Sequence, residues 1–237
     1  MKLFASWFTC LALVLPACGA PSTAASPATP LHAAPVRAEV VSPGGDDLYA
    51  RLVARAEAGD ETVDLLALRR AYLESPAFAQ APAQLDRVAE LRAQMVAAIS
   101  ARDHATVRDR ARAILALQYI DLPAQKARYQ ACQALEDDAC ASRGRYVEHA
   151  MLQSIVSSGD GRSCAHAWNA VTVDEEHFVL RMIDAKLQRQ SVATEGDKVC
   201  DRLDITDVAG QPSTYYFDIT AMLSAENKAL GDAGHSG

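Results

Sequence analysis

The chain has 237 residues, a formal net charge of −7 and a sequence pI of about 5.3. Its lysines and arginines are scattered rather than gathered into a basic stripe, which argues against nucleic acid as a partner. Charged residues make up 22% of the chain and aromatic residues 6%, a composition typical of a soluble, helix-rich globular protein. With an export segment and a polar linker set aside, roughly 180 residues remain, enough for one domain or two small subdomains.

The first residues have the pattern of an export signal. Lys2 supplies a positive charge, and residues 3–15 form an apolar run that is short for a permanent membrane helix. The run ends in Leu15-Pro16-Ala17-Cys18-Gly19, which resembles the lipobox of bacterial lipoproteins.

The lipobox resemblance implies a signal peptide over residues 1–17 and a lipid on the sulfur of Cys18. The alternative is ordinary cleavage near Ala20, which would discard Cys18. Both interpretations export the protein. With the lipid, we expect the bacterial cell envelope, at the outer membrane or the periplasmic face, because Gly19 gives no acidic retention signal. The lipid anchor would be the only link to the membrane.

Residues 18–45 are rich in Ala, Pro and Ser, and five prolines interrupt any helix there. We therefore expect an extended, solvated tether that spaces the folded part from the membrane.

Residues 46–157 have the apolar spacing of helices. A first predicted helix ends at Gly59. Asp64 caps a second predicted helix, which ends at Ser75-Pro76. The longer predicted helices cover residues 83–101, a stretch starting near 103, residues 121–135 and residues 139–156. Short links predict antiparallel pairing, and the spacing of equivalent helices is near the period of tetratricopeptide hairpins. The alternative is an irregular helical bundle.

The pattern changes after residue 157. We expect strands over residues 168–173, 198–205 and 214–219, a turn at 210–212, and a short helix over 174–182 that Asp174 caps. Residues 158–224 are thus predicted to form a small antiparallel α+β unit, and residues 225–237 a frayed tail. The predicted fold class is α+β, with tetratricopeptide-like helical hairpins packed on this unit.

Four cysteines follow Cys18, an even number that favours disulfides in an exported protein. Cys132 and Cys140 flank the turn of the second predicted hairpin, a spacing that resembles the bridged hairpins of Sel1-like repeats. Cys164 and Cys200 would then join the start of the α+β unit to a later strand. The alternative is free or zinc-bound thiols, although no Cys-x-x-Cys pair occurs.

A possible ligand-binding set lies in the C-terminal third: Asp160, Gly161, Glu175, Glu176 and Arg181. The simpler interpretation of the loop around Asp160 is a helix stop before a tight turn, and that of Glu175 and Glu176 is acids favoured in the first turn of a helix. Arg69, Arg70 and Arg181 have the charge to bind an anion, but solvated helix faces also explain them.

No pattern assigns a catalytic residue, a metal ligand or a cofactor. The sequence has no Gly-x-Ser-x-Gly elbow and no His-Glu-x-x-His motif. We therefore expect neither a metal nor a cofactor.

Several segments in their order along the chain are similar to an uncharacterised bacterial family, domain-of-unknown-function family four-nine-one-nine. They are Tyr49 with Leu52-Val53, Gly59-Asp60, Val63-Asp64, Leu68-Arg69-Arg70-Ala71-Tyr72, Tyr119-Ile120-Asp121, Ser154-Ile155, Ser158-Gly159-Asp160-Gly161, Val171-Thr172-Val173-Asp174-Glu175-Glu176, Leu180-Arg181 and Tyr215-Tyr216-Phe217-Asp218-Ile219. The resemblance covers about residues 48–219. It supports the architecture and brings no established activity.

These features favour a non-catalytic envelope protein whose helical hairpins bind one or more other envelope proteins. The competing hypothesis is a small-ligand-processing, hydrolase-like enzyme that uses Asp160, Glu175, Glu176 and His177 in a groove between the two subdomains.

Overall fold

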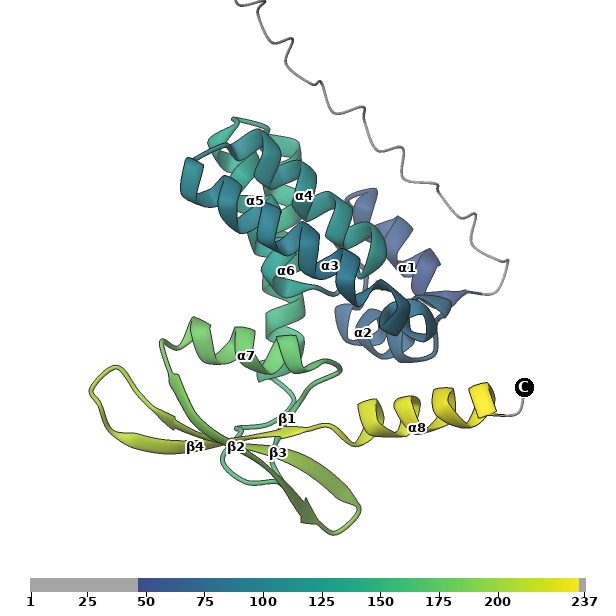
Figure 1. Ribbon diagram of the computed structural model, residues 1–237, viewed down its shortest axis with the longest axis vertical. Coiled ribbons are helices and arrows are strands. Elements are labelled where there is room, and N and C mark those ends of the chain that lie inside the picture. The colour runs from purple at the N-terminus through teal and green to yellow at the C-terminus, as the bar shows by residue number, and fades with distance from the viewer. Residues whose placement is uncertain (1–46, 235–237) are drawn as a thin grey trace, which may run out of the picture. The chain divides into compact units, whose positions relative to one another are not determined.

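The structure is a computed structural model, and it describes residues 47–234 (Figure 1). This part of the chain contains eight helices and four strands, so the predicted α+β class is confirmed. The helices are α1 (Leu48–Glu57), α2 (Leu65–Leu73), α3 (Pro76–Ala101), α4 (His104–Leu117), α5 (Leu122–Ala134), α6 (Asp138–Val156), α7 (Val173–Met182) and α8 (Thr220–Gly234). The strands are β1 (Trp168–Asn169), β2 (Lys186–Glu195), β3 (Lys198–Thr206) and β4 (Pro212–Asp218).

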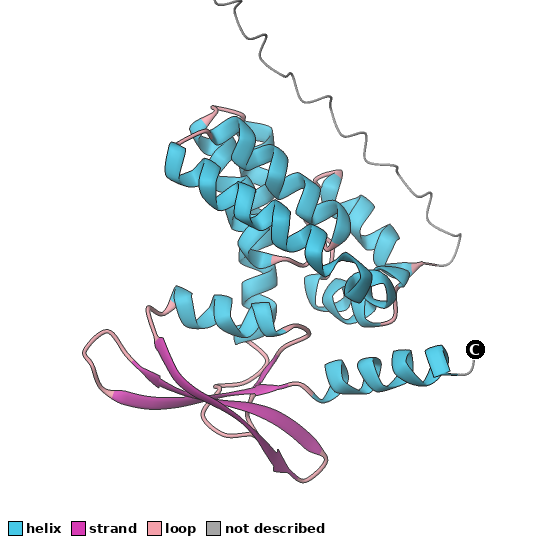
Figure 2. Cartoon of the chain, in the orientation of Figure 1, coloured by secondary structure: helices cyan, strands magenta, loops and turns pink. Residues whose placement is uncertain are grey.

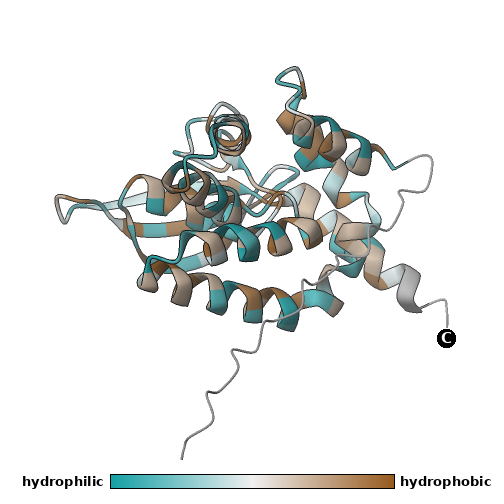
Figure 3. Ribbon diagram, turned by 90° about the horizontal axis from the view of Figure 1, so that it is seen from above, coloured by the Kyte–Doolittle hydropathy of each residue, from teal (hydrophilic) through white to brown (hydrophobic). Residues whose placement is uncertain are grey.

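Two helical hairpins, α3–α4 and α5–α6, turn in the same way. A residue with left-handed backbone follows each first helix: Arg102 (φ 56°) comes directly after α3, and Glu136 (φ 57°) comes two residues after α5. The next residue, Asp103 or Asp137, caps the following helix through its carboxylate. The helices alternate brown and teal in Figure 3, as amphipathic helices do. The sequence therefore encodes a repeated turn, which supports the predicted hairpins.

Helix α3 is longer than the sequence pattern predicts. Ser75 caps it and Pro76 occupies its first turn, where a missing N–H costs nothing. The helix also continues through Pro82. The Ser75-Pro76 pair, expected to end one helix, therefore also begins the next.

The four strands form a sheet in the order β1-β4-β3-β2 (Figure 2). The β2–β3 and β3–β4 pairs are antiparallel, as expected, but β1 is parallel to β4, so the sheet is mixed. The predicted strand at residues 168–173 shortens to two residues because the chain turns into α7 at its cap, Thr172. Thr172, and not Asp174, is thus the capping residue. Strand β2 was not predicted, because its exposed polar sequence lacks the alternation of a half-buried strand.

Helix α7 lies between the helical hairpins and the sheet (Figure 1). The hydrophobic core runs from the helices into the sheet through α7. Leu68 and Ile155 come from the helical side, Phe178 from α7, and Leu203 and Phe217 from the strands, all at most 3% exposed. The helical and sheet regions therefore share one core.

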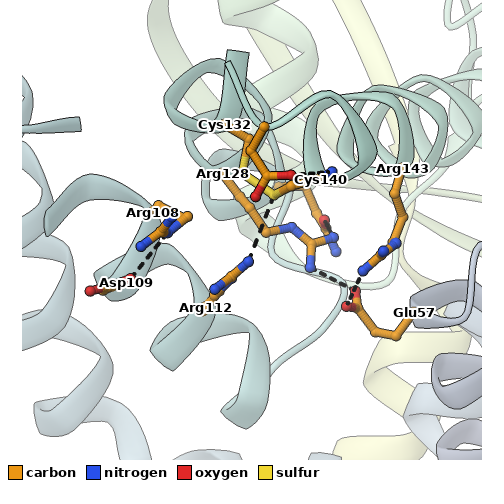
Figure 4. The surroundings of a disulfide bond; sticks show 10 residues. Glu57, Arg108, Asp109, Arg112, Arg128, Cys132, Cys140 and Arg143 are labelled. Carbon is orange, nitrogen blue, oxygen red and sulfur yellow. Dashed lines mark hydrogen bonds and ion pairs between the residues drawn. A yellow bond between two sulfur atoms is a disulfide. The ribbon is translucent and has the colours of Figure 1, made fainter. Parts of the chain in front are cut away.

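Two disulfides cross-link the chain, Cys132–Cys140 and Cys164–Cys200, and both are the expected pairs. The first joins α5 to α6 beside Glu57, which accepts from Arg128 at 2.6 Å and faces Arg143 at 3.6 Å (Figure 4). The second joins the 161–167 loop to β3.

The end of the chain differs from the predicted frayed tail, because α8 continues to Gly234. Alanine, leucine, glutamate and lysine, all good helix formers, supply its middle turns. The signal peptide, Cys18 and the tether lie outside the described residues. No helix between residues 47 and 234 is long and apolar enough to cross a membrane.

Candidate functional site

The centre of the molecule holds a buried arginine–glutamate pair. Arg69 of α2 and Glu175 of α7 are 0% and 1% exposed. The Arg69 Nε and Nη2 atoms each donate to one oxygen of Glu175 at 2.7 Å, the two-pronged geometry that matches guanidinium to carboxylate. The pair is 106 residues apart in sequence, so it ties the helical region to the sheet region.

The remaining groups of this pair are also satisfied. Arg69 donates through Nη1 to the Ser154 hydroxyl at 3.1 Å and through Nη2 to the Asn169 carbonyl at 2.8 Å. Glu175 accepts the Val171 backbone N–H at 2.9 Å. Burial of two charges is tolerated only when such bonds replace water. This saturated cluster therefore positions α2, α6, β1 and α7 relative to one another and leaves no free charge for a ligand.

The next residue on α7, Glu176, is buried without such partners. It is 0% exposed, and neither of its carboxyl oxygens has a hydrogen bond of good geometry to any described residue. Burial, followed by the nearby Asp201 and Glu175 carboxylates, raises its pKa to about 9. Glu176 is therefore protonated at neutral pH. Asp201 of β3 is held by the Gln190 side chain at 2.7 Å.

A second charged cluster, less buried than the first, lies at the N-terminal end of α7. Arg92 of α3 donates to Asp121 at 2.6 Å and to Asp174 at 2.8 Å. Burial raises the pKa of Asp121 even though Arg92 opposes it. Asp121 also caps α5 by accepting from the Ala124 N–H. The arginine thus links α3, α5 and α7.

The predicted loop at residues 157–162 packs against the sheet. Asp160 is exposed and accepts the Arg162 N–H at 2.8 Å, a turn contact. Gly161 has φ +67°, and a Cβ there would lie 2.8 Å from the Trp168 ring. The Trp168 ring stacks on Tyr215 with centroids 4.9 Å apart, and Arg162 lies over Tyr215. This glycine is therefore required for close packing.

The structure does not gather the predicted site residues around one cleft. No hydrogen bond or ion pair among the described residues joins Asp160 to Glu175, Glu176 or His177. Arg181 is exposed and lies 5.9 Å from the Phe178 ring centre. Cys132, Asp137 and Cys140 form the one metal-like cluster in residues 47–234, and its two sulfurs are bonded to each other.

From the sequence, Arg69 is either an anion-binding residue or part of a solvated helix face, but the structure buries it. The signal was present in the spacing. Leu65, Leu68, Arg69 and Tyr72 recur at positions i, i+3, i+4 and i+7 of α2, so they share one face. All four are buried. An arginine on that stripe predicts a buried acidic partner.

A hollow with a volume of about 300 Å³ opens on the surface beside α3. Leu85, Val88 and Arg92 of α3 line it together with Leu117 and Asp174. It is mostly apolar, and the Arg92–Asp174 ion pair lies at its edge.

The fold and its charges define an α+β protein in which helical hairpins are joined to a small mixed sheet through a buried arginine–glutamate pair. The chain belongs to the family described as Domain of unknown function (DUF4919), whose profile matches residues 36–228. The resemblance to family four-nine-one-nine is thereby confirmed. No curated protein and no solved structure matches the chain.

Proposed function

We propose that this protein is exported, is anchored in the bacterial cell envelope by a lipid on Cys18, and acts there as a non-catalytic module that binds another envelope protein. Two disulfides support an oxidising compartment, since such bonds are rare in the cytosol. The lipobox-like segment supports the anchor.

The observation that carries the binding role is an exposed apolar stripe on α3. Leu85, Val96 and Ile99 are 66%, 55% and 50% exposed. Together with Val88 and Arg92, these three residues have the i, i+3, i+7, i+11 and i+14 spacing of one helix face. The apolar spacing predicts one face for Leu85, Val88, Leu91, Met95 and Ile99. The structure buries Leu91 and Met95 of that set and leaves Leu85 and Ile99 exposed. A stripe of this kind beside an apolar hollow fits the amphipathic helix of a partner.

Two of the carboxylates that the enzymatic alternative requires are buried, in contrast to the exposed stripe on α3. Glu175 and Glu176 are at most 1% exposed, and Glu175 is fully engaged by Arg69 and the Val171 N–H. An acid or base in catalysis must reach the proton that it moves. We therefore favour the binding role.

A crosslinking pull-down of the full-length protein from bacterial envelopes tests the proposal. We compare the wild type with Val96→Glu, and use Val208→Glu as a matched control because Val208 is 76% exposed on a distant turn. We expect one reproducible partner that Val96→Glu loses and Val208→Glu retains, with unchanged melting temperatures. A partner retained by both variants, or none in the wild type, would contradict the binding role.

The anchor has a separate readout. Intact mass of the membrane-extracted protein should show acyl groups that Cys18→Ser removes. If the wild-type protein has no acyl groups, the proposed anchor is wrong. The pull-down would still decide the binding role.

A further inference from the structure

Strand β2 is an open edge of the sheet. The strand order β1-β4-β3-β2 gives it one neighbour among the described strands, and it projects with β3 as a hairpin (Figure 2). Most of its residues are exposed, and Val192 in its middle is 66% exposed. An edge of this length offers unpaired backbone N–H and C=O groups to another strand.

The pairing of β2 with β3 determines which backbone groups point outward. Glu195 pairs with Lys198 across a two-residue turn in which Gly196 has φ 63°, as the first central residue of a type II′ turn requires. The pair that closes such a turn is hydrogen-bonded, and bonded and non-bonded pairs alternate along the strand. The N–H and C=O groups of Thr194, Val192 and Gln190 therefore point away from β3.

Only part of β2 is regular. The register shifts between Leu187 and Arg189, a bulge of the type that limits edge pairing, and Lys186 lies beyond it. The regular stretch runs from Arg189 to Glu195, and its central residue is Val192.

We propose that this stretch pairs antiparallel with the same stretch of a second copy, on a two-fold axis at Val192. In that register Gln190 lies opposite Thr194, and Val192 lies opposite itself, which matches the outward-pointing groups and gives about six backbone hydrogen bonds. Arg189 lies opposite Glu195 of the other copy at both ends. The sequence of the edge is thus complementary to itself in charge and in hydrogen bonding.

The charged pairs fall where they interact best. Arg189 and Glu195 occupy a non-hydrogen-bonded position, where Cα atoms of facing residues are only about 4.5 Å apart. Arg189 donates from Nε and Nη2 to one oxygen of Asp204, and its side chain remains 66% exposed. Glu195 accepts the Ala165 N–H through Oε2 at 3.1 Å, which leaves its other oxygen for Arg189 of the second copy. The inference is independent of the proposed function, because it uses a different surface.

Sedimentation equilibrium of the exported protein carrying Cys18→Ser, which removes the proposed lipid site, tests the pairing. A single edge is smaller than a standard interface, so we expect a dimer with a dissociation constant of about 1–100 µM. Arg189→Glu and Glu195→Arg should each weaken the dimer about fivefold or more, and the double variant should restore it. Circular dichroism checks that each variant is folded.

A crosslinking arm tests the register. The four cysteines of the folded region are bonded in pairs, so Val192→Cys introduces a free thiol. It should form an intermolecular disulfide, whereas Val208→Cys, at a still more exposed position (76% against 66%), should not. A protein that stays monomeric at about 500 µM, a dimer unaffected by Arg189→Glu, or a dimer that crosslinks through Val96→Cys instead would each overturn the proposal.

Discussion

Glu175 and Glu176 are neighbours on α7, yet they enter different surroundings. Glu175 points to α2, where Arg69 and the Val171 N–H hold it as a carboxylate. Glu176 points to β3, where it faces the Asp201 carboxylate and no cation. One helix therefore carries two buried acids into the interior by different means.

The difference shows two ways of removing a charge from water. A buried carboxylate can keep its charge if a cation and hydrogen bonds replace the lost water. Without them the group takes up a proton, as the raised pKa of Glu176 indicates. The helical side of α7 is thus fixed by an ion pair, and the sheet side by a neutral acid.

The largest expected effect comes from removing the cation. Arg69→Ala leaves Glu175 buried and unpaired, so we expect a loss of about 3–5 kcal/mol in the free energy of unfolding. Arg69→Lys keeps the charge but not the fork, and its loss should be intermediate. Urea unfolding followed by circular dichroism measures both. The exposed neighbour variant Arg70→Ala is the control and should change stability by less than about 0.5 kcal/mol. A loss below about 1 kcal/mol in Arg69→Ala would mean that the pair does not hold the two regions together.

The second effect is a pH dependence on the sheet side. The pKa of Glu176 is about 9 in the folded protein against a reference value of 4.5. Between these pH values the folded chain holds a proton that the unfolded chain has released, so stability falls as pH rises. The slope is at most about 1.4 kcal/mol per pH unit, which predicts a loss of about 1–3 kcal/mol from pH 6 to pH 8.

Glu176→Gln isolates the contribution of Glu176 to this pH dependence, because Gln stays neutral while Asp121 and the other acids still titrate. We expect the variant to be progressively more stable than the wild type as pH increases. Parallel stability curves for the two proteins between pH 6 and pH 8 would show that Glu176 is already ionised in the folded state.

Much of this architecture was predictable, and the exceptions have physical reasons. The hairpins α3–α4 and α5–α6 follow from helical spacing and capping aspartates, which are local signals. Strand β2 has an exposed, polar sequence, so only its hydrogen bonds to β3 define it. Local patterns do not contain that information.

The candidate site shows the same division. Glu175 and Glu176 were singled out from sequence, but their surroundings depend on Arg69 and Asp201, which are distant in the chain. First-turn acids look alike in sequence whether they cap a helix or enter a core. The exposed half of the α3 stripe was likewise unpredictable, because spacing gives a helix face and not what covers it.

A smaller effect should follow from loosening the start of α7, which positions both acids. The Thr172 hydroxyl accepts the Glu175 N–H at 3.3 Å as the helix cap. Thr172→Ala should cost about 1 kcal/mol, and Thr172→Ser, which keeps the oxygen, should cost less. Thermal and urea unfolding of the three proteins provide the comparison. Equal losses in the two variants would assign the effect to the lost methyl group rather than to the cap.

The smallest expected effect comes from an exposed acid of α7. It tests whether burial, and not charge alone, determines how much an acid of α7 contributes to stability. Asp174 binds Arg92 at 2.8 Å, as Glu175 binds Arg69, but its side chain is 42% exposed. Water can replace its partner, so Asp174→Asn should cost about 0.5 kcal/mol or less. Arg92→Ala should cost more, because it leaves the buried Asp121 without its cation. If Asp174→Asn instead destabilised the protein as much as Arg69→Ala, burial would not be what separates the two ion pairs.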